Sequence, residues 1–67
     1  MINLKINDSL QTFKGPITLK QVLKSLDLEG KPVVIEHNKN AVLPRNYDSI
    51  SLSDGDSIEI ITIAAGG

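Results

Sequence analysis

The segment TLKQVLKSL, residues 18–26, decides the fold. Its apolar side chains lie at positions 19, 22, 23 and 26, a spacing that places them along one stripe of an α-helix. Thr18 and Gln21 have the spacing of a capping box, and Ile17 and Val22 have that of a hydrophobic staple. Because Gly30 is expected just past the end of this helix, we predict a helix over residues 18–27.

The rest of the chain predicts short strands separated by turns. Alternating apolar residues and the turn segments NDS, NKN and SDGDS set their limits. The expected strands are residues 2–6, 10–13, 32–38, 41–43 and 57–63. Residues 44–53 appear irregular, with Tyr47, Ile50 and Leu52 as anchors. A single helix must bury its apolar stripe on one face of one sheet, which predicts a two-layer α+β domain.

Composition excludes several classes of function. Sixty-seven residues allow one domain, and seven basic and eight acidic side chains give a formal charge of −1. This balance argues against binding of nucleic acid or of a membrane surface. The chain has no cysteine, and residues 1–8 alternate as a strand and do not resemble a signal peptide. We therefore expect a cytoplasmic protein with no bound metal or cofactor, whose chemistry depends on a partner.

The last strand carries more apolar side chains than one covered face can bury. Ile58 and Ile60 fall on one face, whereas Ile61 and Ile63 fall on the other with Glu59. The first pair is the better core candidate, so the second pair is expected on an uncovered face that contacts a partner. Burial of one such side chain is worth about 1.5–3 kcal/mol. The alternatives are scattered surface isoleucines, or packing under residues 44–53.

Residues 64–67 are expected to form a flexible tail beyond a domain of residues 1–63. Extended, Ala64, Ala65, Gly66 and Gly67 reach about 13–14 Å. Glycines without Cβ atoms pass through a slot too narrow for other residues. The apolar face, the thin tail and its carboxylate therefore suggest that the reactive group is the terminus of Gly67 itself.

Few side chains suggest chemistry of their own. His37, the only histidine, has no acid or base partner at a readable spacing, and Asp54 and Asp56 indicate a turn because two carboxylates are too few for a calcium loop. Arg45 is a candidate for contact with a partner carboxylate or phosphate, although a solvated loop arginine explains it equally well. Tyr47 is expected to be a core anchor.

The segments LPRNY (43–47) and LSDGDSIEI (52–60), together with Gly66 and Gly67, resemble the ThiS family of sulfur carriers of thiamine thiazole biosynthesis. The resemblance covers nearly the whole chain. It implies a ubiquitin-like β-grasp fold, with a mixed four- to five-stranded sheet and one main helix packed on one face.

The resemblance also implies a mechanism. An E1-like enzyme of the ThiF type adenylates the Gly67 carboxylate with Mg-ATP, and a sulfur donor protein replaces AMP to leave a thiocarboxylate. A thiazole synthase of the ThiG type then takes the sulfur. The chain is thus a protein co-substrate and not an enzyme.

Three other functions remain open at this point. A molybdopterin-type sulfur carrier has the same fold and the same Gly-Gly end. A ubiquitin-like modifier passes its activated terminus to a lysine amine. A binding module of this fold makes no use of the tail.

Overall fold

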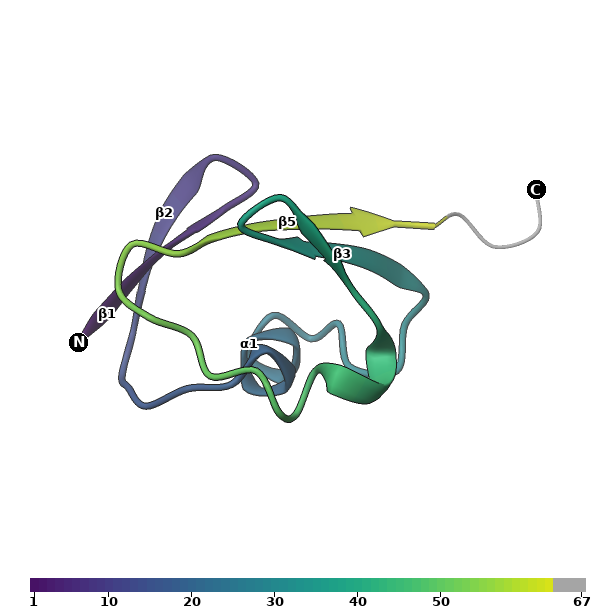
Figure 1. Cartoon of the computed structure of the whole chain (residues 1–67), viewed down its shortest axis with the longest axis horizontal. Coiled ribbons are helices and arrows are strands. Elements are labelled where there is room, and N and C mark those ends of the chain that lie inside the picture. The colour runs from purple at the N-terminus through teal and green to yellow at the C-terminus, as the bar shows by residue number, and fades with distance from the viewer. Residues whose placement is uncertain (64–67) are drawn as a thin grey trace.

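The computed structural model describes residues 1–63 as one five-stranded sheet with one α-helix packed against it (Figure 1). Residues 64–67, on which the expected tail and its four site residues fall, lie outside the described residues. The elements in chain order are β1 (Ile2–Ile6), β2 (Ser9–Phe13), α1 (Leu19–Ser25), β3 (Val33–His37), β4 (Asn40–Val42), the 3₁₀ helix η1 (Pro44–Asn46) and β5 (Ser57–Thr62). Within residues 1–63, no helix is long and apolar enough to cross a bilayer.

The sheet is mixed, with strand order β2-β1-β5-β3-β4. Two hairpins, β1–β2 and β3–β4, are antiparallel, and β5 lies between them. It runs parallel to β1 and antiparallel to β3. Both hairpin turns place two residues in the left-handed region that tight two-residue turns require: Asn7 and Asp8 in the first, Asn38 and Lys39 in the second. The mixed sheet that the resemblance implies is confirmed.

Helix α1 begins where the sequence predicts. The Thr18 side chain accepts a hydrogen bond from the Gln21 backbone (3.2 Å), and the Gln21 side chain accepts one from the Thr18 backbone (2.8 Å). These two bonds form a capping box. The first N–H groups of a helix have no partner within the helix. Here those of Leu19 and Lys20 donate to the carbonyls of Ile50 and Tyr47, at 3.0 Å each. The helix start therefore fixes the segment that follows β4.

Helix α1 ends at Ser25, two residues before the predicted end at residue 27. Asp27, not Gly30, takes the left-handed conformation that ends α1, with φ of 60°. The Leu28 N–H donates to the Leu23 carbonyl (2.8 Å) and the Asp27 N–H to the Lys24 carbonyl (3.1 Å), which together form a Schellman motif. Leu28 packs against the core beyond this turn, so its burial sets the helix length. Gly30 has a positive φ in the loop that follows.

The core lies between α1 and the sheet. Ile58 and Ile60 are buried in it, as the alternation in the last strand predicts. The remaining buried members come from β1, β3, α1 and two loop positions: Leu4, Ile6, Ile17, Leu19, Val22, Leu23, Ile35 and Leu52. Tyr47 and Ile50 are half-buried against this cluster, so the expectation that they anchor their segment is confirmed.

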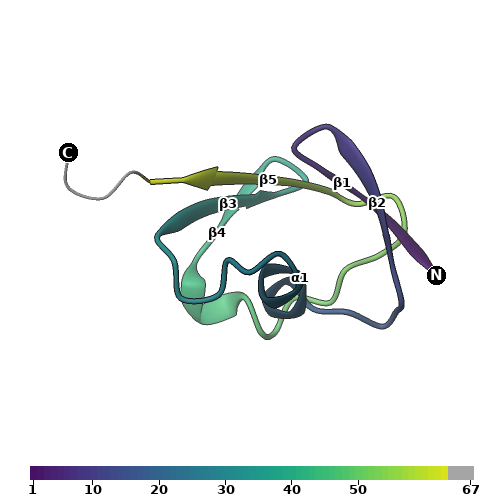
Figure 2. The same ribbon diagram turned by 180° about the vertical axis from the view of Figure 1, so that it is seen from behind.

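Residues 44–53 are more regular than the sequence suggests. They begin with η1, and Ser51 then forms an isolated antiparallel bridge with Thr18. Figures 1 and 2 show this segment and α1 on the same side of the sheet. The segment therefore cannot cover the opposite face, which we call the outer face.

Candidate functional site

The outer face carries an apolar patch at the end of β5. Ile61 and Ile63 are 55% and 51% exposed, in contrast to the buried Ile58 and Ile60 one residue out of phase. Residues 44–53 lie on the other side of the sheet, so packing under that segment is excluded as the reason for these two isoleucines. Their predicted exposure is confirmed, and their contact with a partner stays a prediction.

Two further side chains extend this patch across the sheet. Val34 pairs with Ile61 in the β3–β5 register and is 43% exposed. Because Ile35 pairs with Val42, Leu43 comes level with Val34, and it is 52% exposed. We call Val34, Leu43, Ile61 and Ile63 the outer patch. The alternation within VVIEH places Val34 opposite Ile35, so the sequence held a signal for it, whereas Leu43 needed the strand register.

A side chain of the first hairpin turn fixes β5 just before the outer patch. The Asn7 amide donates to the Ile60 carbonyl (3.0 Å), and its oxygen accepts from the Ile60 N–H (2.7 Å). The Asn7 N–H also donates to the Ile58 carbonyl (2.9 Å). Asn7 therefore adds one rung to the parallel ladder after β1 has turned away. Sequence reasoning treated this residue only as part of a turn.

The far end of β5 is held from its other side. The Ile63 N–H donates to the Pro32 carbonyl at 3.0 Å, which continues the β3–β5 pairing past the last strand residue. Together with Asn7 this bond holds the backbone of β5 in the sheet as far as Ile63. Ile61 and Ile63 of the outer patch therefore lie on a stretch of chain that is hydrogen-bonded on both sides.

Arg45 is not part of the outer patch. It lies in η1 on the helix side of the sheet, is exposed, and lines a groove there. The structure thus separates Arg45 from Ile61 and Ile63, which sequence analysis grouped as partner-binding residues. Its contact with a partner carboxylate or phosphate stays a prediction.

His37 has a partner that its sequence position does not reveal. Its Nε2 lies 2.8 Å from Asp56 Oδ2, and Asp56 also accepts hydrogen bonds from the Ser53 backbone (2.9 Å) and the Asn38 side chain (3.2 Å). Burial raises the pKa of the Asp56 carboxyl, but the hydrogen bonds from His37, Ser53 and Asn38 outweigh it and lower that pKa below its usual range. The cluster ties the β3–β4 turn to the start of β5.

Asp54 and Asp56 serve the turn that precedes β5, as expected. The Asp54 carboxylate accepts a hydrogen bond from the Asn3 N–H at 2.6 Å. Gly55, which lies between Asp54 and Asp56 in the sequence, has φ of 92°. Among the described residues, no group of three or more His, Cys, Asp or Glu side chains is arranged to hold a metal ion.

Comparison with known proteins places the chain. The model of the ThiS family matches residues 4–67. The chain belongs to the ThiS family.

Relatives and solved structures agree with this assignment. The chain is 38% identical to the sulfur carrier protein ThiS of Bacillus subtilis over 50 residues, which cover 75% of this chain and 76% of that protein. The crystal structure of the thiamine biosynthesis protein ThiS from Geobacter metallireducens superimposes with a TM-score of 0.82 at 25% identity, covering 98% of this chain and all of that one. The β-grasp fold expected from the resemblance is thereby confirmed.

One relative is much longer than this chain. A thiazole synthase of Paramagnetospirillum magneticum is 29% identical over 66 residues, which cover 98% of this ThiS-family chain and only 20% of that protein. A ThiS-like segment therefore forms one fifth of a polypeptide named for thiazole synthesis.

Proposed function

We propose that this chain is a sulfur carrier of thiamine biosynthesis whose reactive group is the carboxylate of Gly67. Its membership of the ThiS family carries the proposal. Two of its relatives, from Bacillus subtilis and Thermus thermophilus, are named sulfur carrier protein ThiS. The chain acts as a protein co-substrate, because the chemistry takes place at its terminus in the active sites of other enzymes.

A free carboxylate needs activation before sulfur can replace one of its oxygens. Its negative charge repels nucleophiles, and oxide is a poor leaving group. An E1-like enzyme of the ThiF type uses Mg-ATP to convert the Gly67 carboxylate into an acyl-adenylate, releasing pyrophosphate. A persulfide on a sulfur donor protein then attacks the acyl carbon, and AMP leaves with one carboxylate oxygen. A thiol reductant cleaves the S–S bond to the donor protein and leaves the outer sulfur on Gly67. The product is a thiocarboxylate, and ATP and Mg belong to the partner enzyme.

The outer patch supports a docking role beside this chemistry. Val34, Leu43, Ile61 and Ile63 expose apolar surface on the face that α1 does not cover, on and beside the strand that leads to Gly67. A partner that binds this patch holds Ile63, which is four residues before Gly67. Binding energy from a remote surface can thus position the carboxylate for reaction.

A thiazole synthase of the ThiG type is the proposed acceptor of the sulfur. The thiazole synthase of Paramagnetospirillum magneticum, with its ThiS-like segment, supports this partner. Joining a carrier to its acceptor in one polypeptide raises their effective concentration, because the encounter becomes intramolecular.

Mass spectrometry of the intact chain, with fragmentation of its C-terminal end, tests the proposal. The chain is incubated with ATP, a sulfur donor and the E1-like enzyme of its host, and sulfur is expected on Gly67. Fragmentation is needed because oxidation of Met1 produces the same nominal mass change as exchange of oxygen for sulfur. The variant lacking Gly66 and Gly67 is the control. A plain carboxylate on Gly67 after complete incubation contradicts the proposal, and transfer of the terminus to lysine amines indicates a protein modifier.

A further inference from the structure

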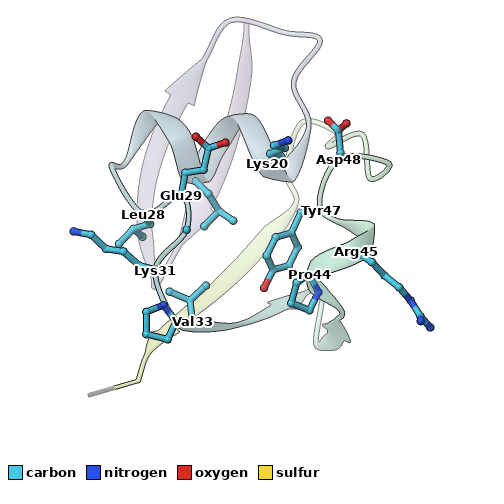
Figure 3. Close-up of a pocket in the computed structure, with 12 residues that line it drawn as sticks. Lys20, Leu28, Glu29, Lys31, Val33, Pro44, Arg45, Tyr47 and Asp48 are labelled. Carbon is cyan, nitrogen blue, oxygen red and sulfur yellow. The ribbon is translucent and has the colours of Figure 1, made fainter. Parts of the chain in front are cut away.

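The helix side of the molecule carries a groove that the outer patch does not reach (Figure 3). It has a volume of about 510 Å³ and lies between the end of α1, the loop before β3 and η1. The apolar residues that line it are Leu23, Leu28, Pro32, Val33, Pro44 and Tyr47. We call this the helix-side groove. Its volume is within the range of about 300–1,000 Å³ typical of ligand-binding clefts.

The lining of the helix-side groove suits an apolar side chain better than a polar metabolite. Leu28, Val33 and Tyr47 are only partly buried in the free chain, so they offer apolar surface to an occupant. Sites for small polar molecules present buried polar groups that converge on the ligand. Among residues 1–63, no polar or charged side chain is buried. The groove therefore favours a peptide segment anchored by one bulky apolar residue.

The charged side chains at the rim of the groove indicate the sign of the charge that a bound peptide segment should carry. Lys20, Lys31 and Arg45 line the groove together with two carboxylates, Glu29 and Asp48. Within the described part of the chain, none of the three cations forms an ion pair, since the ion pairs there join Lys5 to Asp8 and His37 to Asp56. The groove thus carries a positive surplus on a protein whose formal charge is −1.

The arrangement of these cations leaves them free to meet an extended segment. Figure 3 shows Lys31 and Arg45 extending away from Tyr47 on opposite sides. Both are exposed. A peptide that places an apolar side chain over Tyr47 has a cation within reach on either side of that anchor. Carboxylates that flank the anchor therefore complement the rim.

Residues that line the helix-side groove are hydrogen-bonded to β5 and to Ile63 just after it. Pro32 lines the groove, and its carbonyl accepts the hydrogen bond from the Ile63 N–H at 3.0 Å. Val33 lines the groove as well and pairs with Thr62 of β5. The groove therefore lies beside Ile63, and an enzyme that contacts Ile63 is close to the groove as well.

We propose that the helix-side groove binds an acidic segment with one bulky apolar side chain, supplied by a partner enzyme that acts on Gly67. This inference rests on the proposed function, since it requires such an enzyme. It adds a second docking surface on the opposite side of the sheet from the outer patch. One enzyme can then grip the carrier from both sides, or two enzymes can use different faces.

Amide NMR of the isotopically labelled chain locates the contact without any substitution. The E1-like adenylating enzyme and the thiazole synthase of the same host are titrated in separately. Resonance changes at residues 28–33 and 45–48 with at least one enzyme support the proposal. Changes confined to the outer patch with both enzymes overturn it. Changes at the groove on concentrating the chain alone also overturn it, because they indicate that a second copy fills the groove.

Charge reversal then tests the acidic character of the occupant. For the enzyme that changes the groove resonances, the Kd of the double variant Lys31→Glu and Arg45→Glu is expected to rise about tenfold or more. The introduced carboxylates then face the acidic segment of that enzyme, and like charges repel. A control with the same change in net charge, Lys14→Glu and Lys39→Glu, alters exposed lysines outside the groove and should stay within about twofold. Equal weakening in both double variants overturns the proposal, because it reflects overall charge alone.

Sulfur loading of Gly67 separates this proposal from the function on which it rests. If the wild-type terminus acquires sulfur but the Lys31→Glu, Arg45→Glu variant binds both enzymes as tightly as the wild type does, only the helix-side groove proposal fails. If the wild-type terminus acquires none, the sulfur-carrier function fails. Circular dichroism of each variant confirms that its fold is retained before binding is compared.

Discussion

Replacing Ile61 and Ile63 with threonine should weaken binding of the adenylating enzyme while preserving the fold. Full burial of an isoleucine stabilises by about 1.5–3 kcal/mol. Because these side chains are 55% and 51% exposed in the free chain, a partner can remove only about half of each from water. The two substitutions together are then worth about 1.5–3 kcal/mol, which is about a tenfold to hundredfold increase in Kd.

The free energy of unfolding should change much less than binding. Threonine is β-branched and keeps the strand preference of isoleucine, and neither position belongs to the buried core. We expect a loss of about 1 kcal/mol or less for each substitution, measured by urea unfolding. The tail sequence is unchanged, so adenylation of Gly67 at saturating carrier should proceed at its normal rate.

Calorimetric titration and pyrophosphate release measure these two effects separately. KM for the carrier should rise with Kd, and kcat should stay constant. Leu10→Thr is the matched control, because Leu10 is 72% exposed on β2 at the other edge of the sheet and should have no effect. Unchanged Kd and KM in the folded double variant would refute the docking role of the outer patch. Equal weakening by Leu10→Thr would also refute it.

Three further substitutions test the architecture around the site. Asp27→Gly should stabilise the chain by about 0.5–1 kcal/mol in urea unfolding, because glycine takes the left-handed helix-end conformation without strain; a loss of stability would show that the Asp27 side chain has a role in the folded state. Asn7→Gly keeps a left-handed turn but removes two hydrogen bonds to Ile60, so unfolding should become easier by about 1–3 kcal/mol and amide exchange at Ile60 faster. Unaltered exchange there would contradict the role given to Asn7. The lowered pKa of the Asp56 carboxyl means that its ionised form stabilises the fold above the usual aspartate pKa, and that this contribution is lost as pH falls through the lowered value. Thermal unfolding of Asp56→Asn should therefore depend less on pH than that of the wild type below about pH 4, and parallel pH profiles would contradict this.

The sequence predicted those features that depend on near neighbours. The start of α1 rests on Thr18 and Gln21, three residues apart, which bond each other as the capping-box spacing requires. Its end was mispredicted because glycine is the usual signal, and here the packing of Leu28 against the core places Asp27 in the glycine-like conformation. Local chemistry cannot reveal how much of a following loop the core will bury.

Contacts between distant residues were beyond the reach of a single sequence. Pairing of Lys5 with Ser57 places β5 in the middle of the sheet, and nothing in either segment specifies the other. His37 and Asp56 lie 19 residues apart in sequence and meet because β3 pairs with β5, which places His37 opposite Ile58. Strand alternation identified Ile61 and Ile63, but the full outer patch and the helix-side groove required the register and the loop positions.

The central place of β5 has a consequence for how the protein is made. The ribosome releases both hairpins before it releases the strand that joins them, so a nascent chain that ends before β5 holds two separate hairpins. The sheet closes only after the segment that leads to Gly67 has been synthesised. Chains that end before β5 are expected to lack a closed sheet and to be cleaved readily by proteases, so the folded molecules are those that contain the strand preceding Gly66 and Gly67.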